Sequence, residues 1–387
     1  MTRKSPVGAF KSFGKKKWLS FGGWINAVIP VLIVPYYSVI GGWVIKYLVE
    51  YFRGNAKQLA EDGYFTDFIS NGVSTELCFM AFCAFTLIII FAGVQNGIER
   101  VSKIMMPILI VLSVIIAVYS VTRPGALAGV KYFLVPNVKN FSWMTVVSAM
   151  GQMFYSLSIA MGILITFGSY MKKDTAIEDS TRNVEVFDTG IAIMAGLMII
   201  PAVFAFSGGD PDTLQAGPSL MFITIPKVFQ NMGFGTVIGI VFFLLVLFAA
   251  VTSSIALTES AVSTFEDELG WGRKKATVLV GVIMLALGSL SSLGYGPLAG
   301  IKIIGMQFLD LFDFLTNSVM MPIAALLTSL LVSRVVGIDK IEEEIIHGES
   351  AFRRKKVFVV MIKYLCPVFA IIILLSSVAN ALGWIKM

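Results

Sequence analysis

The spacing of charged residues constrains this chain more than any other feature of its sequence. Charged residues make up only 14% of its 387 residues, and they divide it into long uncharged runs. One helix needs about 20 apolar residues to cross the hydrocarbon core of a bilayer. We therefore expect nine membrane spans, within residues 18–45, 77–98, 104–122, 141–171, 189–209, 228–258, 276–301, 314–333 and 364–385. The runs indicate an integral membrane protein and predict an all-α, polytopic membrane helix bundle.

The distribution of Lys and Arg predicts how the chain is oriented in the membrane. With the amino terminus inside, the inner loops hold 20 Lys and Arg residues and the outer loops hold 8. Because cytoplasmic loops are enriched in basic residues, we expect the amino terminus inside and the carboxyl terminus outside. Residues 1–17 are then a cytoplasmic basic arm, and residues 18–387 are the transmembrane domain. The basic excess indicates a lipid bilayer as partner, and no nucleic acid.

The sequence contains no pattern typical of an enzyme. Cys78, Cys83 and Cys366 all lie in apolar runs, so no disulfide framework follows. The single histidine, His347, lies in a charged loop, and no HExxH, P-loop or GxSxG pattern occurs. We expect no catalytic activity and no cofactor.

The run 141–171 contains the stretch GQMFYSLSIAMG and is about ten residues longer than one helix needs. Ser156, Ser158 and Gly162 lie at its centre, and we expect the helical hydrogen bonding to be interrupted between Phe154 and Gly162. A break at mid-membrane is tolerated only where it lines a cavity. Carbonyl and amide groups exposed by such a break can bind ions and a charged solute, as in many secondary transporters.

Two loops are expected to contain short structures of their own. Residues 208–231 contain three prolines and the apolar segment LMFITIPKVF, which is too short to cross the membrane. We expect a re-entrant or capping hairpin there, on the outer face. Residues 339–356 are highly charged and are expected to form a short surface helix on the inner face.

Two groups of oxygen atoms could bind a hard monovalent cation. Ala249, Thr252 and Ser253 lie at i, i+3 and i+4, so the Ala249 carbonyl and both hydroxyls share one helix face. Several such oxygens suit a hard cation, but hydroxyls in membrane helices also serve as interhelical packing and hydrogen bonds. Ser156 and Asn183 form a second group, in which Asn183 could equally cap a helix.

One acid and two tyrosines are further candidates for a binding site. Asp313 opens the run 314–333, where it could belong to a site or simply face the lipid headgroups. Tyr36 and Tyr37 lie in mid-span. A buried tyrosine hydroxyl needs a partner, which could be another helix or a solute carboxylate.

Taken in order, several segments resemble the bacterial branch of the neurotransmitter:sodium symporter family. They are VPYYSVIGGW, GVQNGIERVSKIMMP, GQMFYSLSIAMG with FGSYMKKD, RNVEVFDTGIAIMAGLMIIPAVFAF, GPSLMFITIPKVF, AAVTSSIAL with FEDELGWGRKKA, and FLDLFDF. The resemblance covers nearly the whole chain. It implies a LeuT-like fold of two inverted five-helix units and symport that couples inward sodium movement to amino-acid uptake.

The resemblance also implies roles for individual residues. Ala249, Thr252 and Ser253 look like part of one sodium site, and Ser156 and Asn183 look like part of the other. Tyr37 resembles the hydroxyl that binds the substrate carboxylate, and Tyr155 resembles the aromatic lid. Five residues resemble the family's pocket for the substrate side chain: Ile33, Ser158, Met161, Ser254 and Leu257. The apolar walls of such a pocket favour a neutral hydrophobic or aromatic amino acid. Asp313 with Gln152 resembles the family's outer gate, and Asp267 with Tyr170 resembles its inner gate.

The chain departs from the family pattern in two ways. The family has two further helices before the span near Trp18, and the first of them supplies ligands to both sodium sites and basic partners to both gates. The expected fold is therefore a truncated inverted repeat (5+5) with a broken central helix. Half a sodium shell does not offset the dehydration of a hard ion, so we expect that this polypeptide alone neither binds sodium tightly nor transports. In addition, Ala160 stands where the family usually has Gly.

A second hypothesis belongs to a different functional class. The chain could be a non-transporting remnant, or a regulatory partner of a full-length transporter, including the case of a split gene. On either hypothesis we expect a multi-pass protein of the cell's inner (plasma) membrane.

Overall fold

The computed structural model describes residues 1–14, 16–214, 217–349 and 351–381. In this part of the chain, eight helical segments are long and apolar enough to cross a membrane. They are α2 (Lys17–Phe52), α5 (Gly72–Phe91), η1 with α6 (Val94–Val121), α10 (Ile177–Ser207), α13 (Gly235–Leu269), α14 (Arg273–Leu293), α15 to η6 (Phe308–Val336) and α18 to α19 (Lys355–Ala381). The segment 308–336 is composed of α15 (Phe308–Asp313), η5 (Phe314–Met320), α16 (Met321–Leu330) and η6 (Leu331–Val336), and the segment 355–381 of α18 (Lys355–Val360), η7 (Met361–Leu365) and α19 (Cys366–Ala381).

The long central run forms two shorter helices. They are α8 (Trp143–Ser156) and α9 (Ile163–Tyr170), and residues 157–162 between them belong to neither helix. The prediction of an all-α fold with a broken central helix is therefore confirmed. The break falls where Ser and Gly residues interrupt an otherwise apolar run.

Short elements fill the ends of the bundle. They are α1 (Pro6–Ser12), α3 (Ala56–Leu59), α4 (Tyr64–Ser70), α7 (Ala126–Leu134), η2 (Val138–Asn140), η3 (Pro211–Thr213), α11 (Gly217–Ser219), η4 (Leu220–Thr224), α12 (Ile225–Gln230) and α17 (Ile338–Ile346). The helix α17 lies in the charged inner loop, where a short surface helix was expected.

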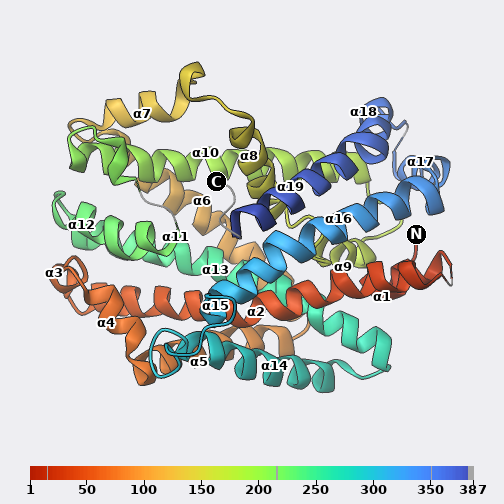
Figure 1. Ribbon diagram of the computed structural model, residues 1–387, viewed down its shortest axis with the longest axis horizontal. Coiled ribbons are helices and arrows are strands. Elements are labelled where there is room, and N and C mark those ends of the chain that lie inside the picture. Colours follow the sequence, from red (N-terminus) through yellow and green to blue (C-terminus); the bar gives the residue numbers. More distant parts are fainter. Residues whose placement is uncertain (15, 215–216, 350, 382–387) are drawn as a thin grey trace.

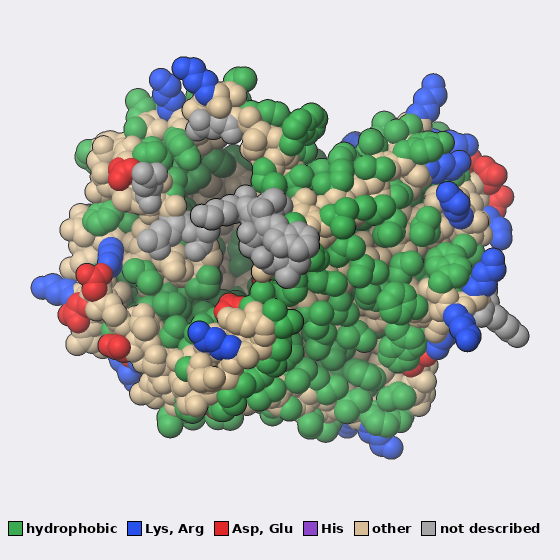
Figure 2. Space-filling model, viewed as in Figure 1, with side chains coloured by type: hydrophobic (Ala, Val, Ile, Leu, Met, Phe, Trp, Pro, Cys, Tyr) green, Lys and Arg blue, Asp and Glu red, His purple; other side chains and the backbone are tan. Residues whose placement is uncertain are grey.

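The helices run along the longest axis of the molecule, with α2 and α13 passing through its middle (Figure 1). Charged side chains gather at the two ends of this axis, and the surface between them is largely apolar (Figure 2). The end that carries the amino terminus, α17 and α18 is the inner end under the predicted topology, and the end with α3, α4 and α12 is the outer one.

The helix α2 is the centre of the packing because it contacts α1, α5, α13 and α14. Its outer half forms an aromatic cluster with side chains of α4 and α13. The Trp43 ring meets Phe65 edge-on at 5.3 Å between centroids, and Tyr47 stacks on Phe243 at 5.2 Å. Edge-on and offset rings of this kind add to the free energy gained by burying their apolar surface.

The apolar segment 220–229 does not cross the membrane. It forms η4 and α12, which cover the outer end of the bundle, and the Tyr47 hydroxyl donates to the Phe222 carbonyl at 2.7 Å. Lys227 of α12 also pairs with Asp62, and this positive charge lowers the pKa of the Asp62 carboxyl. The segment is therefore a cap, held by one buried hydrogen bond and one surface ion pair.

The amino-terminal arm is folded into the bundle rather than extended. Its residues 6–10 are buried in α1, which packs on α2, and the Ser5 amide donates to the Asp267 carboxylate at 2.6 Å. The basic composition of the arm concealed this apolar core of five residues.

Two inner loops cap one another's helices. The Glu349 carboxylate accepts from the Glu178 amide at 2.5 Å at the start of α10. In return, the Glu178 carboxylate accepts from the Arg353 amide at 2.9 Å and the Arg354 amide at 3.1 Å, at the start of α18. Acids at helix amino termini satisfy free amide groups and favour the helix dipole. The exchange fixes α10 against α18 at the inner end.

Candidate functional site

The break in the central helix has an unusual backbone. Ser158, Ala160 and Gly162 have φ of 53°, 61° and 71°, all in the left-handed region. Non-glycine residues seldom adopt this conformation, and it recurs at ligand-binding sites. The Ile159 amide donates to the Phe154 carbonyl at 2.9 Å, which closes the end of α8. The chain thus turns sharply at the depth where the sequence predicted a binding segment.

Gly162 is required because α2 approaches it closely. A Cβ at this position would lie 2.7 Å from the Asn26 carbonyl oxygen and 3.0 Å from the Ser260 hydroxyl. The break therefore packs directly on α2 and α13, and both helices help to fix its position.

The residues of the predicted side-chain pocket come from three elements. Ile33 on α2, Met161 at the break and Leu257 on α13 are all buried, and Ser158 and Tyr155 are half-buried. Ser254 is also buried, but its hydroxyl lies 3.1 Å from that of Thr86 on α5. Ser254 therefore has a partner inside the protein.

The oxygens of the first predicted sodium group lie together on α13. The Thr252 hydroxyl donates to the carbonyls of Phe248 and Ala249, at 3.1 and 3.0 Å. Next to it, the Ser253 side chain interacts with that of Tyr37 on α2. The arrangement joins the predicted sodium ligands to the tyrosine predicted to bind a carboxylate.

The second predicted sodium group has an unexpected member. The Ser156 hydroxyl donates to the Asp188 carboxylate on α10 at 2.6 Å, whereas Asn183 has an exposed side chain. Asp188 is not among the site residues predicted from the sequence. Its position at the edge of the uncharged run 189–209 was the available signal, since acids within membrane helices are costly and commonly functional.

The predicted outer gate is built around Asp313. Its carboxylate accepts from the Tyr36 hydroxyl at 3.2 Å and from the Asn317 amide at 2.6 Å. Gln152, the predicted partner, has an exposed side chain. Tyr36, rather than its neighbour Tyr37, is thus the tyrosine that binds this acid.

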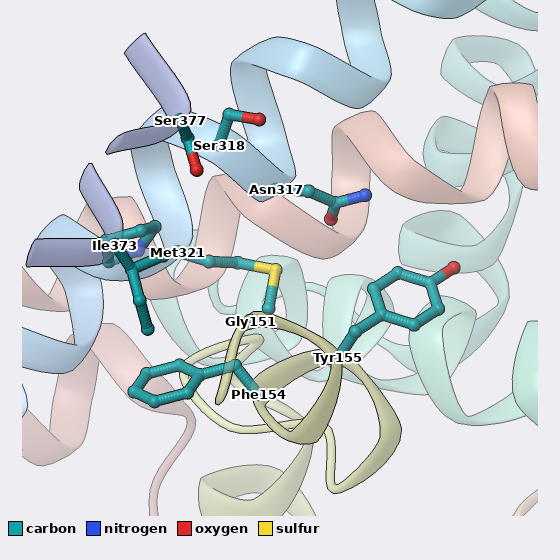
Figure 3. A pocket seen from close by; sticks show the side chains of 9 residues that line it. Gly151, Phe154, Tyr155, Asn317, Ser318, Met321, Ile373 and Ser377 are labelled. Atoms are coloured by element: carbon teal, nitrogen blue, oxygen red, sulfur yellow. The ribbon is translucent and has the colours of Figure 1, made fainter. Parts of the chain in front are cut away.

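A cavity of about 160 Å³ lies beside this cluster. Phe154 and Tyr155 on α8 line one side, and Asn317 and Met321 line the other, with Ile373 of α19 (Figure 3). The predicted aromatic lid, Tyr155, therefore forms part of the wall of this cavity.

The predicted inner gate pairs differently from expectation. The Tyr170 hydroxyl donates to Glu259 at 2.7 Å, and Asp267 accepts instead from the Ser5 amide. Glu259 is fully buried and forms two hydrogen bonds with the Arg273 guanidinium, at 3.1 and 2.6 Å. Neither Glu259 nor Arg273 is among the predicted gate residues, although Glu259 follows directly after the uncharged run 228–258.

Removing the Tyr36 hydroxyl tests the cluster around Asp313. We expect Tyr36→Phe to lower the free energy of unfolding by about 1–2 kcal/mol, because the Asp313 carboxylate loses the hydrogen bond that the buried Tyr36 side chain donates. Tyr51→Phe is the matched control: the Tyr51 hydroxyl is buried without a hydrogen-bond partner among the described residues, so its removal should cost little. Thermal unfolding of the two variants in detergent compares them, and equal losses would contradict the assignment.

Known proteins with similar sequences and structures were found. The sequence profile of the sodium:neurotransmitter symporter family matches residues 49–384. The chain is 33% identical to an uncharacterized sodium-dependent transporter of Bacillus subtilis, YhdH, over 96% of this chain and 82% of that protein. It is 29% identical to an uncharacterized sodium-dependent transporter of Haemophilus influenzae, over 97% and 84% of the two chains.

The fold matches that of a solved transporter. The crystal structure of MhsT in complex with L-phenylalanine superposes with a TM-score of 0.84 at 32% identity, covering 97% of this chain and 85% of that one. The resemblance noted in the sequence is therefore confirmed by a family match over most of the chain and by the three-dimensional fold. The chain is a multi-pass membrane protein of the sodium:neurotransmitter symporter family, whose members are transporters and not enzymes.

Proposed function

We propose that this protein takes part in sodium-coupled uptake of a neutral hydrophobic or aromatic amino acid across the plasma membrane. The observation that carries the proposal is the interrupted helix between Ser156 and Ile163, which packs at Gly162 against Ser260 of α13, the helix that also carries Thr252 and Ser253. A break at this depth presents backbone groups to a solute and its coupling ions. Family membership makes sodium the expected ion.

The lining of the break supports the substrate class. Ile33, Met161 and Leu257 are apolar and buried, and Tyr155 adds an aromatic ring. Such walls suit an apolar side chain, and the solved relative MhsT was crystallised with L-phenylalanine. Tyr37 is the proposed ligand of the substrate carboxylate, because its hydroxyl already lies beside Ser253.

The two predicted groups of oxygen ligands are the proposed sodium sites. The Ala249 carbonyl with the Thr252 and Ser253 hydroxyls would bind one sodium ion, and Ser156 with Asn183 would contribute to a second. Hard cations bind carbonyl, hydroxyl and carboxylate oxygens. Asp313 and Gln152 on the outside, and Asp267 and Tyr170 on the inside, are the proposed gate residues.

Binding of L-phenylalanine to the purified chain tests the proposal. Sodium should be required for binding, and choline at equal concentration should not replace it. Thr252→Ala should raise the half-saturating sodium concentration about tenfold or more, because the cation loses one hydroxyl oxygen ligand. Thr277→Ala is a control, since Thr277 bonds to its own helix at the Arg273 carbonyl. Absence of sodium-dependent binding would contradict the proposal for this polypeptide and agree with the inactivity expected from the sequence.

A further inference from the structure

A partly buried carboxylate that is not among the proposed central-site residues lies between α5 and α14. Glu76 is in the second turn of α5, and one of its oxygens accepts a hydrogen bond from the Ser289 hydroxyl on α14. The Glu76 side chain is only partly exposed. An acid held against a neighbouring membrane helix is costly unless it is neutralised or fully hydrogen-bonded.

The polar atoms around Glu76 are not all satisfied. The second carboxylate oxygen, Oε2, is buried and has no hydrogen-bond partner among the described residues, and the same is true of the Ser292 hydroxyl. Ser292 is 1% exposed. Buried polar groups in folded proteins are nearly always paired, so two unpaired groups in one interface indicate a bound species.

The geometry of α14 places Ser292 on the same side as Glu76. A Cβ on Gly288 would meet the Phe79 ring of α5, and Ser289 bonds to Glu76. Successive residues of a helix are rotated by about 100° around its axis. Viewed down the axis, residue 289 is therefore about 100° from residue 288, and residue 292 is about 40° from residue 288 in the same direction. Residue 292 thus faces a direction between those of residues 288 and 289. Ser292 therefore faces α5, one turn nearer the outer end of the bundle than Ser289.

Within the described part of the chain, Glu76 has no cationic partner. Among the residues that the structure describes, no Lys or Arg forms an ion pair with it, and Lys46 of the adjacent α2 pairs with Glu50. The interface thus offers one negative charge with two hydroxyls and no positive charge of its own. Hard monovalent cations prefer oxygen ligands of this kind.

We propose that Glu76, Ser289 and Ser292 form a binding site for a hard monovalent cation of the size of sodium, at the outer end of the α5–α14 interface. It is separate from the Ala249 group, which lies on α13. A cation there would satisfy both unpaired oxygens and join two helices that flank the central α2.

Sodium-dependent thermal stability of the purified full chain tests this site. The midpoint temperature of thermal unfolding is measured while NaCl replaces choline chloride. The ionic strength stays constant, so the screening of charges does not change. The Thr252→Ala background weakens sodium binding at the proposed central site. In that background, Glu76→Gln and Ser292→Ala should each raise the half-saturating sodium concentration about tenfold or more.

Ser291→Ala is the matched control, because Ser291 is as buried as its neighbour but bonds to the Leu287 carbonyl of its own helix. It should leave the half-saturating concentration unchanged. Two results would overturn the proposal. One is an unchanged sodium dependence in both Glu76→Gln and Ser292→Ala. The other is a Thr252→Ala background that is stabilised by lowering the pH and not by sodium, which would assign a proton to Glu76 instead.

Discussion

Replacing Glu259 by alanine is expected to lower the free energy of unfolding by about 3–5 kcal/mol. Glu259 is completely buried and accepts two hydrogen bonds from Arg273 and one from Tyr170. Removing one partner of a buried pair leaves the other charge without compensation. Among the described residues, Arg273 would keep the Ile90 carbonyl at 3.0 Å and the more distant Glu266 as partners.

Unfolding by heat or by denaturing detergent measures this loss. Glu266→Gln is the matched control, because Glu266 lies 3.9 Å from Arg273 and is partly exposed, so its loss should cost less than about 1 kcal/mol. A double variant, Glu259→Leu with Arg273→Leu, should recover part of the loss, since replacing both charges removes the unpaired one. Equal losses in Glu259→Ala and Glu266→Gln would show that the pair does not hold the inner end together.

Gly162→Ala is expected to destabilise the protein by about 2–5 kcal/mol, despite adding a single methyl group. The left-handed backbone accounts for about 1–2 kcal/mol of this, since Gly162 has φ of 71°. Overpacking against the Asn26 carbonyl and the Ser260 hydroxyl accounts for about 1–3 kcal/mol. The backbone of α2 cannot retreat without disturbing the core.

The same substitution at Gly151 is the control within the same stretch. Gly151 is in α8, and a Cβ there would have no neighbour within 4 Å. Gly151→Ala should therefore be neutral or stabilising by up to about 1 kcal/mol, because alanine favours the helix. If thermal unfolding gave similar midpoints for the two variants, the close packing of the break on α2 would be wrong.

Eight of the nine predicted spans coincide with helical segments long enough to cross a membrane, and the ninth, 141–171, forms two shorter helices instead. The central break and the short cap over residues 220–229 were also predictable from the sequence. Each depends on residues that are neighbours along the chain. Uncharged runs fix which segments can lie in a bilayer, and the run 141–171 is too long and too rich in Ser and Gly to form one helix. The segment 220–229 is apolar but too short to cross. The helix α1 was not predicted, because the buried residues of α1 lie among lysines in the sequence.

Partner choice was decided by the tertiary structure alone. Tyr170 bonds to Glu259 and not to Asp267, and Ser156 bonds to Asp188 on another helix. A side chain on a membrane helix can meet any of several neighbouring helices, and its partner depends on their rotation and depth. Hydropathy and charge spacing determine where this chain crosses the membrane. Only the packing of the helices determines which polar groups meet there, because those contacts join residues up to hundreds of positions apart in the sequence.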